Sequence, residues 1–207
     1  MSDARAKVTH GDAETRRRIT LEAASALLDE GGYTALTMRA VAERAGMSVG
    51  LIYQYFADKS DIFITLLTES QVEARESLAA LPREQGLTEL LRALIPEAAR
   101  QWRRVGRFTA TWRDSGGRLA ERESIRDVRR TADAYNADLV AALHQAAAAE
   151  GAELIDDPAV LPYVLSSIQG LADTMVHQWA RDLDDSRLID FTATAVARAI
   201  GRKSERG

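Results

Sequence analysis

Hydrophobic and polar positions follow a helical period along nearly the whole chain, and no stretch shows the two-residue alternation of a half-buried strand. The first periodic segment extends from about Asp12 to Glu30, and one of its faces carries Ile19, Ala23, Ala26 and Leu27. Three short helices are expected after Gly31 and Gly32, followed by long ones over residues 58–81, 87–113, 119–150, 158–182 and 186–201. The pattern therefore predicts an all-α protein.

Composition narrows the class of protein. The chain has 207 residues, of which 46% are hydrophobic and 28% charged, and it has no cysteine. These values predict a folded soluble protein with no disulfide, no thiolate nucleophile and no cysteine-based zinc site. Apolar runs are too short for a membrane span, and the polar first residues do not form a signal peptide, so a cytoplasmic protein without membrane contact is expected. A net charge of −4 argues against nonspecific coating of nucleic acid but allows a small DNA-reading surface.

Two short helices joined by a glycine-containing turn are predicted near residue 46. Thr37 is a good N-cap for the first helix, whose apolar positions from Met38 to Ala45 share one face. Gly46 supplies a left-handed C-terminal cap, and Ser48 then caps the second helix. This arrangement is typical of the helix-turn-helix unit.

The second short helix is expected to present a reading surface. Ile52 and Phe56 are four residues apart and should pack inward, which leaves the other faces to Val49, Gly50, Leu51, Tyr53, Gln54 and Tyr55. A glycine allows close approach of backbone to DNA, and tyrosine hydroxyls reach phosphate oxygens. Asp58 is expected to cap the next helix, so that Lys59 brings a cation close to the phosphates.

Residues 36–61, LTMRAVAERAGMSVGLIYQYFADKSD, closely resemble the TetR (tetracycline repressor) family of transcriptional regulators. The resemblance implies that phosphates are held by Thr37, Tyr53, Tyr55 and Lys59. It implies that base edges are faced by Arg39, Val49, Gly50 and Leu51, with Ser48 beside them. Positions 49 and 51 are often polar in the family but are Val and Leu here, so Arg39, Gln54 and the basic N-terminal arm are left to supply polar specificity. The net charge of this segment does not indicate whether it binds DNA, because basic and acidic residues balance over residues 1–60. The alternative is a helical hairpin whose tyrosines are packed in the core and which does not bind DNA.

The expected organisation is a DNA-binding domain over residues 1–60 and a ligand-binding and dimerisation domain over residues 61–207. In the resembling family, the last two helices pair with their symmetry mates, which implies a homodimer here. Apolar residues recur with a helical period in the segment 158–183 and again from Leu188 to Ile200. The alternative is that both faces belong to the core of a single subunit.

The middle helices are expected to hold an effector pocket. Its candidate lining residues are Phe108, Trp112, Tyr135, Leu139, Leu143, Tyr163, Met175 and His177. Arginine clusters at 103–107 and 126–130 suggest an anionic effector such as an acyl-CoA-like thioester, and a hydrophobic compound is the other expectation. Ordinary core packing of the apolar residues and salt-bridged helix faces at the arginine clusters are the simpler explanations of the same residues.

Sequence motifs that are typical of catalytic or metal sites are incomplete in this chain. The segment Asp114-Ser115-Gly116-Gly117 is like a serine protease loop, but that chemistry needs a β-rich scaffold and a histidine base. The three histidines are far apart in sequence and have no ligand at helical spacing, so no metal site, cofactor or catalytic residue is expected. The sequence therefore predicts a dimeric, ligand-responsive repressor that binds a palindromic operator. The alternatives are a helical ligand-binding or interaction module without operator binding and an all-α enzyme.

Overall fold

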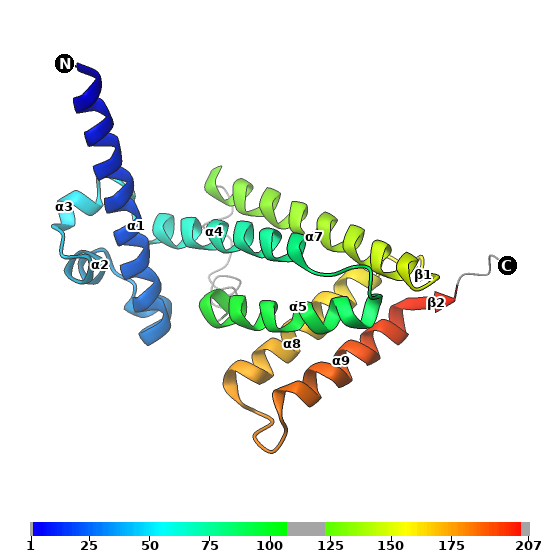
Figure 1. Ribbon diagram of the computed structural model, residues 1–207. Helices are drawn as coiled ribbons and strands as arrows, with labels where there is room; N and C mark the ends of the chain where they lie inside the picture. Colours follow the sequence, from blue (N-terminus) through cyan, green and yellow to red (C-terminus); the bar gives the residue numbers. More distant parts are fainter. Residues whose placement is uncertain (1, 107–122, 204–207) are drawn as a thin grey trace. The chain divides into compact units, whose positions relative to one another are not determined.

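The computed structural model describes residues 2–106 and 123–203, and these divide into two compact units (Figure 1). The first unit consists mainly of the residues up to Glu69, and the second of Ser70–Gly106 and the residues from Asp127 onward. The division falls inside the helix α4 (Lys59–Ala80), whereas the sequence places the domain boundary at residue 60, where this helix begins. The all-α prediction is confirmed.

The first unit packs the helices α1 (Ser2–Ala35), α2 (Met38–Ala45) and α3 (Val49–Ile52) with the first half of α4. α1 begins well before the expected Asp12, and non-helical backbone at Gly32 breaks it where the glycine pair predicts. Its buried stripe is Leu21, Ala24 and Leu28, with Ala23 beside it. Of the expected face, Ile19, Ala26 and Leu27 are only half-buried. The core is completed by Leu36, Val41, Ile52, Phe56 and Phe63, so the inward packing predicted for Ile52 and Phe56 is confirmed.

The second unit is a helical bundle around α5 (Leu87–Gln101). α5 packs against α8 (Val160–His177) and α9 (Asp185–Ile200), and these two helices also pack against each other. α7 (Glu123–Ala149) adds Leu139 and Leu143 to the same core, which also contains Leu90 and Ile168. The bundle therefore buries one continuous apolar cluster.

Two local features differ from the pattern expected of the sequence. The long helix expected over residues 87–113 changes at residue 102 into a short π-helix, η1 (Trp102–Gly106). A two-stranded antiparallel sheet pairs β1 (Ala152–Leu154) with β2 (Gly201–Lys203), although no strand was expected. Each strand has only three residues, which is too short for an alternating pattern to be recognisable.

Candidate nucleic-acid interface

The α2–turn–α3 unit is fixed by local capping interactions. The Thr37 hydroxyl accepts the backbone N–H of Ala40 at 3.1 Å, and the Ser48 hydroxyl accepts the backbone N–H of Leu51 at 3.2 Å. Gly46 ends α2 with φ 65° and ψ 31°, in the left-handed region that costs glycine little. The three capping residues predicted from sequence therefore occupy those positions.

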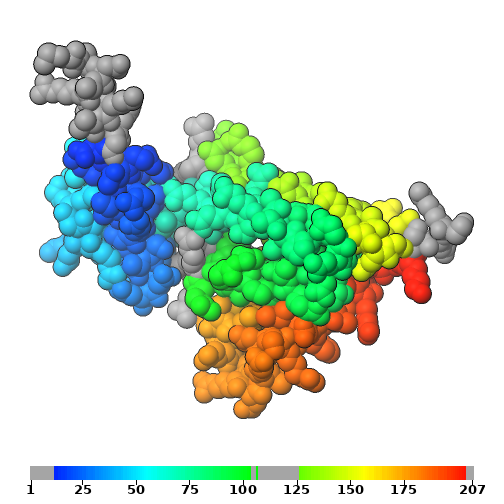
Figure 2. All heavy atoms as spheres, viewed as in Figure 1, coloured from blue at the N-terminus to red at the C-terminus, as the bar shows by residue number. Residues whose placement is uncertain are grey.

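α3 turns its apolar side inward and leaves a mixed face outward. Ile52 and Phe56 are buried, whereas Val49, Gly50, Tyr53 and Gln54 are exposed. Leu51 and Tyr55, which were also expected to point outward, are half-buried. Figure 2 shows α3, coloured cyan, at the surface of its unit.

Gly50 is not explained by the requirements of the fold. Its backbone does not adopt the left-handed conformation, and a Cβ built on it would meet no atom within 4 Å. A larger side chain would therefore fit at this position without strain in the isolated subunit. What the glycine leaves is a low, open surface on which another backbone can approach closely.

The N-terminus of α2 lies next to the same face. Thr37 and Arg39 are both exposed, and Thr37 uses only its oxygen lone pair in the cap, so its hydroxyl proton is left to donate to a ligand. Within the described residues, the Arg39 guanidinium forms no ion pair. An anion at this helix end would meet both side chains and the positive end of the helix dipole.

Lys59 is held in place by a neighbouring aromatic ring. Its Nζ lies 4.3 Å from the centroid of the Tyr33 ring and donates to the Tyr33 carbonyl oxygen at 3.5 Å. The Tyr33 hydroxyl is 3.0 Å from the Ser60 hydroxyl, and the ring packs edge-on against Phe63. The cap expected at Asp58 is present as well, because its carboxylate accepts the backbone N–H of Asp61 at 3.0 Å.

Two arginines of α1 belong to this neighbourhood although sequence reasoning did not single them out. The Tyr55 side chain, and after it the Asp12 carboxylate, raise the pKa of Arg16 above its ordinary value. Arg17 has its guanidinium carbon 5.5 Å from the centroid of the Phe56 ring and pairs with Glu69 at 3.3 Å. The signal in the sequence was the run of three consecutive arginines at 16–18.

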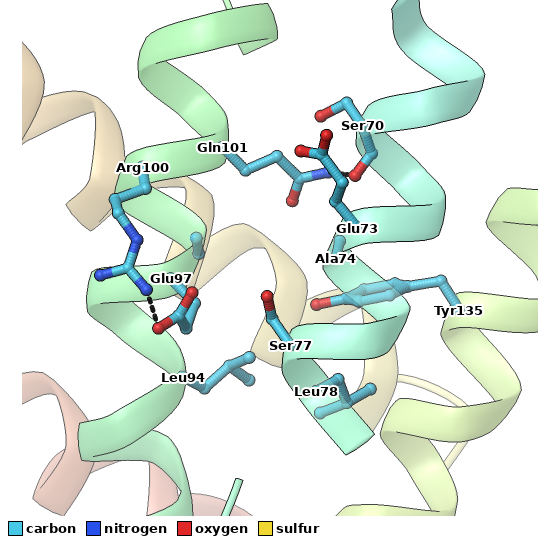
Figure 3. A pocket seen from close by; sticks show the side chains of 11 residues that line it. Ser70, Glu73, Ala74, Ser77, Leu78, Leu94, Glu97, Arg100, Gln101 and Tyr135 are labelled. Carbon is cyan, nitrogen blue, oxygen red and sulfur yellow. Dashed lines mark hydrogen bonds and ion pairs between the residues drawn. The ribbon is translucent and has the colours of Figure 1, made fainter. Parts of the chain in front are cut away.

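In the second unit, a cavity of about 180 Å³ lies between α4, α5 and α7 (Figure 3). Tyr135 lines it, as the sequence predicts, together with the polar residues Ser70, Glu73, Ser77, Glu97, Arg100 and Gln101, which were missed. Burial raises the pKa of the Tyr135 phenol, which therefore stays protonated at neutral pH. Apolar walls are contributed by Leu78 and Leu94.

The other candidate lining residues lie in different places. Leu139 and Leu143 are fully buried in the core, and Met175 packs against that core. Tyr163 is exposed on α8. Phe108 and Trp112 lie outside the described residues.

His177 belongs to a cluster at the end of α8. Its Nδ1 lies 2.9 Å from the carbonyl oxygen of Asp173 and 3.0 Å from the carboxylate of the same residue. That carboxylate also accepts the indole N–H of Trp102 at 2.9 Å. Asp173 therefore links η1 to α8, and His177 contacts Asp173 from the same helix.

Exposed aromatic side chains gather on α8, on α9 and on the segment between them. Trp179 is 70% exposed and Phe191 is 76% exposed, and Tyr163 and Leu183 are exposed as well. In Figure 2 these elements, coloured orange to red, form much of one surface of their unit. Large apolar groups at such exposure are typical of a surface that contacts a partner.

Among the residues that the structure describes, no three His, Asp or Glu side chains are grouped closely enough to hold a metal ion. No helix within the same ranges is long and apolar enough to cross a membrane.

Comparison with known proteins identifies a family and several relatives of this chain. Residues 21–66 match the family described as bacterial regulatory proteins, tetR family. The repressor AcnR of Corynebacterium glutamicum is 30% identical over 132 residues, which are 58% of this chain and 68% of that protein. The repressor KstR of Rhodococcus jostii is 34% identical over 96 residues, 46% of this chain and 44% of that protein, so the chain spans less than half of this relative.

The fold of the whole chain is shared with solved structures. A TetR family transcription regulator from Marinobacter aquaeolei superimposes with a TM-score of 0.66 at 18% identity, over 94% of this chain and 99% of that one. At this identity the likeness shows the fold alone. The family match, residues 21–66, contains both α2 and α3.

Proposed function

The chain belongs to the tetR family of bacterial regulatory proteins, and from this premise we propose that it is a DNA-binding transcriptional repressor. It binds a palindromic operator as a homodimer and is released by a small-molecule effector. The observation that carries the proposal is α3 itself, with an apolar face in the core and an open outer face centred on Gly50. The family match contains this helix, and relatives of the chain are named as repressors.

The residues around α3 divide into two groups by the part of DNA that they suit. Hydroxyl and ammonium groups at Thr37, Tyr53, Tyr55 and Lys59 bind phosphate oxygens and set the position of the unit on the duplex. Arg39 and Gln54 donate to base edges, and Val49 and Leu51 contact thymine methyl groups in the major groove. Ser48 caps α3, and Gly50 lets the helix approach the groove closely.

The homodimer is proposed to form through α8 and α9. Phe191 on α9 and Trp179 just after the end of α8 expose large apolar surface, and a second copy of the chain would remove that surface from water. Two recognition helices about 34 Å apart would then read the two halves of a palindrome.

Release of the operator is proposed to follow a shift in population between two arrangements of the dimer. An effector shifts the equilibrium only by its difference in affinity for the two states, and a complete switch needs about 5.5 kcal/mol of difference. The cavity between α4, α5 and α7 is the proposed effector site. α4 contributes Ser70, Glu73 and Ser77 to it and also carries Lys59 at its first turn.

The competing function is a helical ligand-binding or interaction module that does not bind an operator. Nuclease footprinting on the DNA upstream of the protein's own gene, followed by selection from random duplexes, separates the two. We expect a protected palindrome whose affinity falls steeply with salt, because phosphate contacts release counterions. Failure to select any sequence at low salt would favour the module.

The variant Arg39→Ala is the sharpest check within this experiment. Loss of an exposed guanidinium should weaken operator binding and relax specificity at one base position, at a cost of about 1–3 kcal/mol. Arg202→Ala, which removes the same charge from β2 in the second unit, is the matched control. Equal affinities of the two variants would remove Arg39 from the interface.

A further inference from the structure

Two hydroxyl groups in the lining of the cavity between α4, α5 and α7 are not used within the described part of the protein. Ser77 and Tyr135 form no side-chain hydrogen bond with any residue that the structure describes. By contrast, Thr65 and Thr68 on α4 each donate to the backbone carbonyl oxygen four residues earlier, at 2.9 Å. Figure 3 shows the hydroxyl groups of Ser77 and Tyr135 pointing into the cavity, where a ligand would meet both.

Both hydroxyl groups are available as hydrogen-bond donors. Burial raises the pKa of the Tyr135 phenol, so it keeps its proton at neutral pH, as the Ser77 hydroxyl does. Both side chains are half-buried, and a donor that is shielded from water is stabilised when a ligand supplies an acceptor. A carbonyl oxygen has two lone pairs and can accept from both hydroxyl groups at once, whereas an ammonium group accepts no hydrogen bond.

The charged groups of the described lining already have partners. Arg100 forms an ion pair with Glu97, so these two charges compensate each other. Glu73 has an interaction of its own and is exposed, so that water also screens its charge. The Gln101 amide donates to the Ser70 carbonyl oxygen at 3.3 Å. A charged ligand would give up its hydration here without gaining an opposite charge, which favours a neutral one.

The size and the walls of the cavity limit the rest of the ligand. Its volume is about 180 Å³, and an apolar cavity of about 150 Å³ in another protein is known to bind benzene. The buried side chains of Leu78 and Leu94 form apolar walls, together with Ala74 and Ala98. A compound with one six-membered ring or a chain of similar size therefore fits, whereas the acyl-CoA-like thioester expected from the sequence is far too large.

We propose that this cavity binds a small neutral carbonyl compound, such as a ketone with a short apolar body. Its carbonyl oxygen accepts from the hydroxyl groups of Tyr135 and Ser77. Its apolar body lies against Leu78 and Leu94. The carbonyl site deepens the effector part of the proposed function and rests on it only for the consequence that such a compound would release DNA.

The test is calorimetry on the purified full chain without DNA. The probes are cyclohexanone, the cationic cyclohexylamine and the anionic cyclohexanecarboxylate, which share a six-membered ring and differ in the head group. We expect the ketone to bind at least about tenfold more tightly than either charged compound, because neither of these finds a free opposite charge in the lining. Binding of the amine or of the carboxylate as tight as that of the ketone would overturn the proposal, as would the absence of ketone binding.

Variants separate the two hydrogen bonds from general packing. Tyr135→Phe and Ser77→Ala each remove one hydroxyl group, and each should weaken ketone binding about fivefold. Urea unfolding of the ligand-free variants should stay close to that of the parent, because neither hydroxyl has a partner among the described residues. Tyr163→Phe, at an exposed tyrosine of α8 outside the described lining, is the matched control and should bind the ketone like the parent. Ketone affinity unchanged in both lining variants would contradict the assignment.

Failure of this proposal is distinguishable from failure of the proposed function. Operator binding is measured on the ligand-free protein, so a protein that binds DNA but no ketone refutes only the carbonyl site. A protein that binds the ketone but selects no DNA keeps the carbonyl site and refutes the operator.

Discussion

Lys59 is the side chain of the proposed DNA surface whose position is most fully determined by its neighbours. The Tyr33 ring lies under the ammonium group, the Tyr33 carbonyl accepts from it, and Ser60 and Phe63 hold the ring itself. A long flexible lysine normally loses side-chain entropy when it is fixed on a ligand. Here part of that loss occurs on folding, because Tyr33 already holds the lysine, so Tyr33 is a positioning residue for the proposed phosphate contact.

Replacing Tyr33 should therefore change how DNA binding depends on salt. Tyr33→Leu removes the ring, and the slope of log affinity against log salt concentration should become shallower by about 0.9 for each phosphate that the protein no longer neutralises. Tyr33→Phe keeps the ring and should restore the parent slope, although it lacks the hydroxyl that meets Ser60. Fluorescence anisotropy at several salt concentrations measures both, with Lys59→Gln as the reference for a protein without this ammonium group. A parent-like slope in Tyr33→Leu would leave the ring a purely structural role.

Gly50 lends itself to a prediction in which stability and binding change in opposite directions. Gly50→Ala introduces a Cβ that meets no atom of the subunit, and it should raise the free energy of unfolding by up to about 0.5–1 kcal/mol. The same methyl group projects from the surface proposed to face the groove, so operator affinity should fall. Urea unfolding and a DNA titration are the two measurements. An unchanged operator affinity would show that DNA does not approach at this position.

At the scale of elements, α2 and α3 are short helices that depend on their ends. Neither is long enough to be stable by itself, so the caps at Thr37, Gly46 and Ser48 and the buried side chains beneath them determine where they begin and end. This is also why the sequence predicts them well. The signals for a cap, a left-handed glycine and the next cap lie within a few residues of one another and need no knowledge of the rest of the fold.

Gly46 should respond to substitution in the opposite way to Gly50. Its φ of 65° is unfavourable for any residue with a Cβ, and no atom lies within 4 Å of the position such a Cβ would occupy. Gly46→Ala should therefore lower the free energy of unfolding by about 1–2 kcal/mol through the backbone alone. Gly46→Asn should cost less, because asparagine tolerates this conformation. Urea denaturation of the three proteins tests the order, and an Ala variant as stable as the parent would contradict it.

Elements whose signals are not local were predicted poorly. The strands β1 and β2 lie far apart in the sequence, and their pairing depends on where α7 and α9 end. The cavity lining was also missed except for Tyr135, since an aromatic at helical spacing is visible in a sequence whereas Glu97 and Ser77 resemble any polar helix surface. The buried face of α1 also differs from the predicted one. Packing against the other helices, and not the periodicity of α1 itself, determines which of its small apolar residues are buried.

At the scale of the whole molecule, the exposed apolar side chains on α8 and α9 predict the state of association. Phe191→Asp places a charge where the proposed partner subunit packs, and it should convert the dimer into a monomer in sedimentation velocity. The monomer would bind a single half-site, so its affinity for DNA should no longer depend on the distance between the two half-sites. Val72→Asp, at an exposed apolar position of α4, is the control and should stay dimeric. A dimer that survives Phe191→Asp would place the interface elsewhere.

The small sheet has a consequence for how the second unit comes apart under force. β2 follows α9 directly and is held by antiparallel pairing of Lys203 with Ala152 and of Gly201 with Leu154. A pull applied beyond Lys203, as by an ATP-driven unfoldase, therefore loads the pairing of Lys203 with Ala152 first. The pull then passes directly into α9. Degradation from this side would unfold the proposed partner-binding helix before the unit proposed to bind DNA.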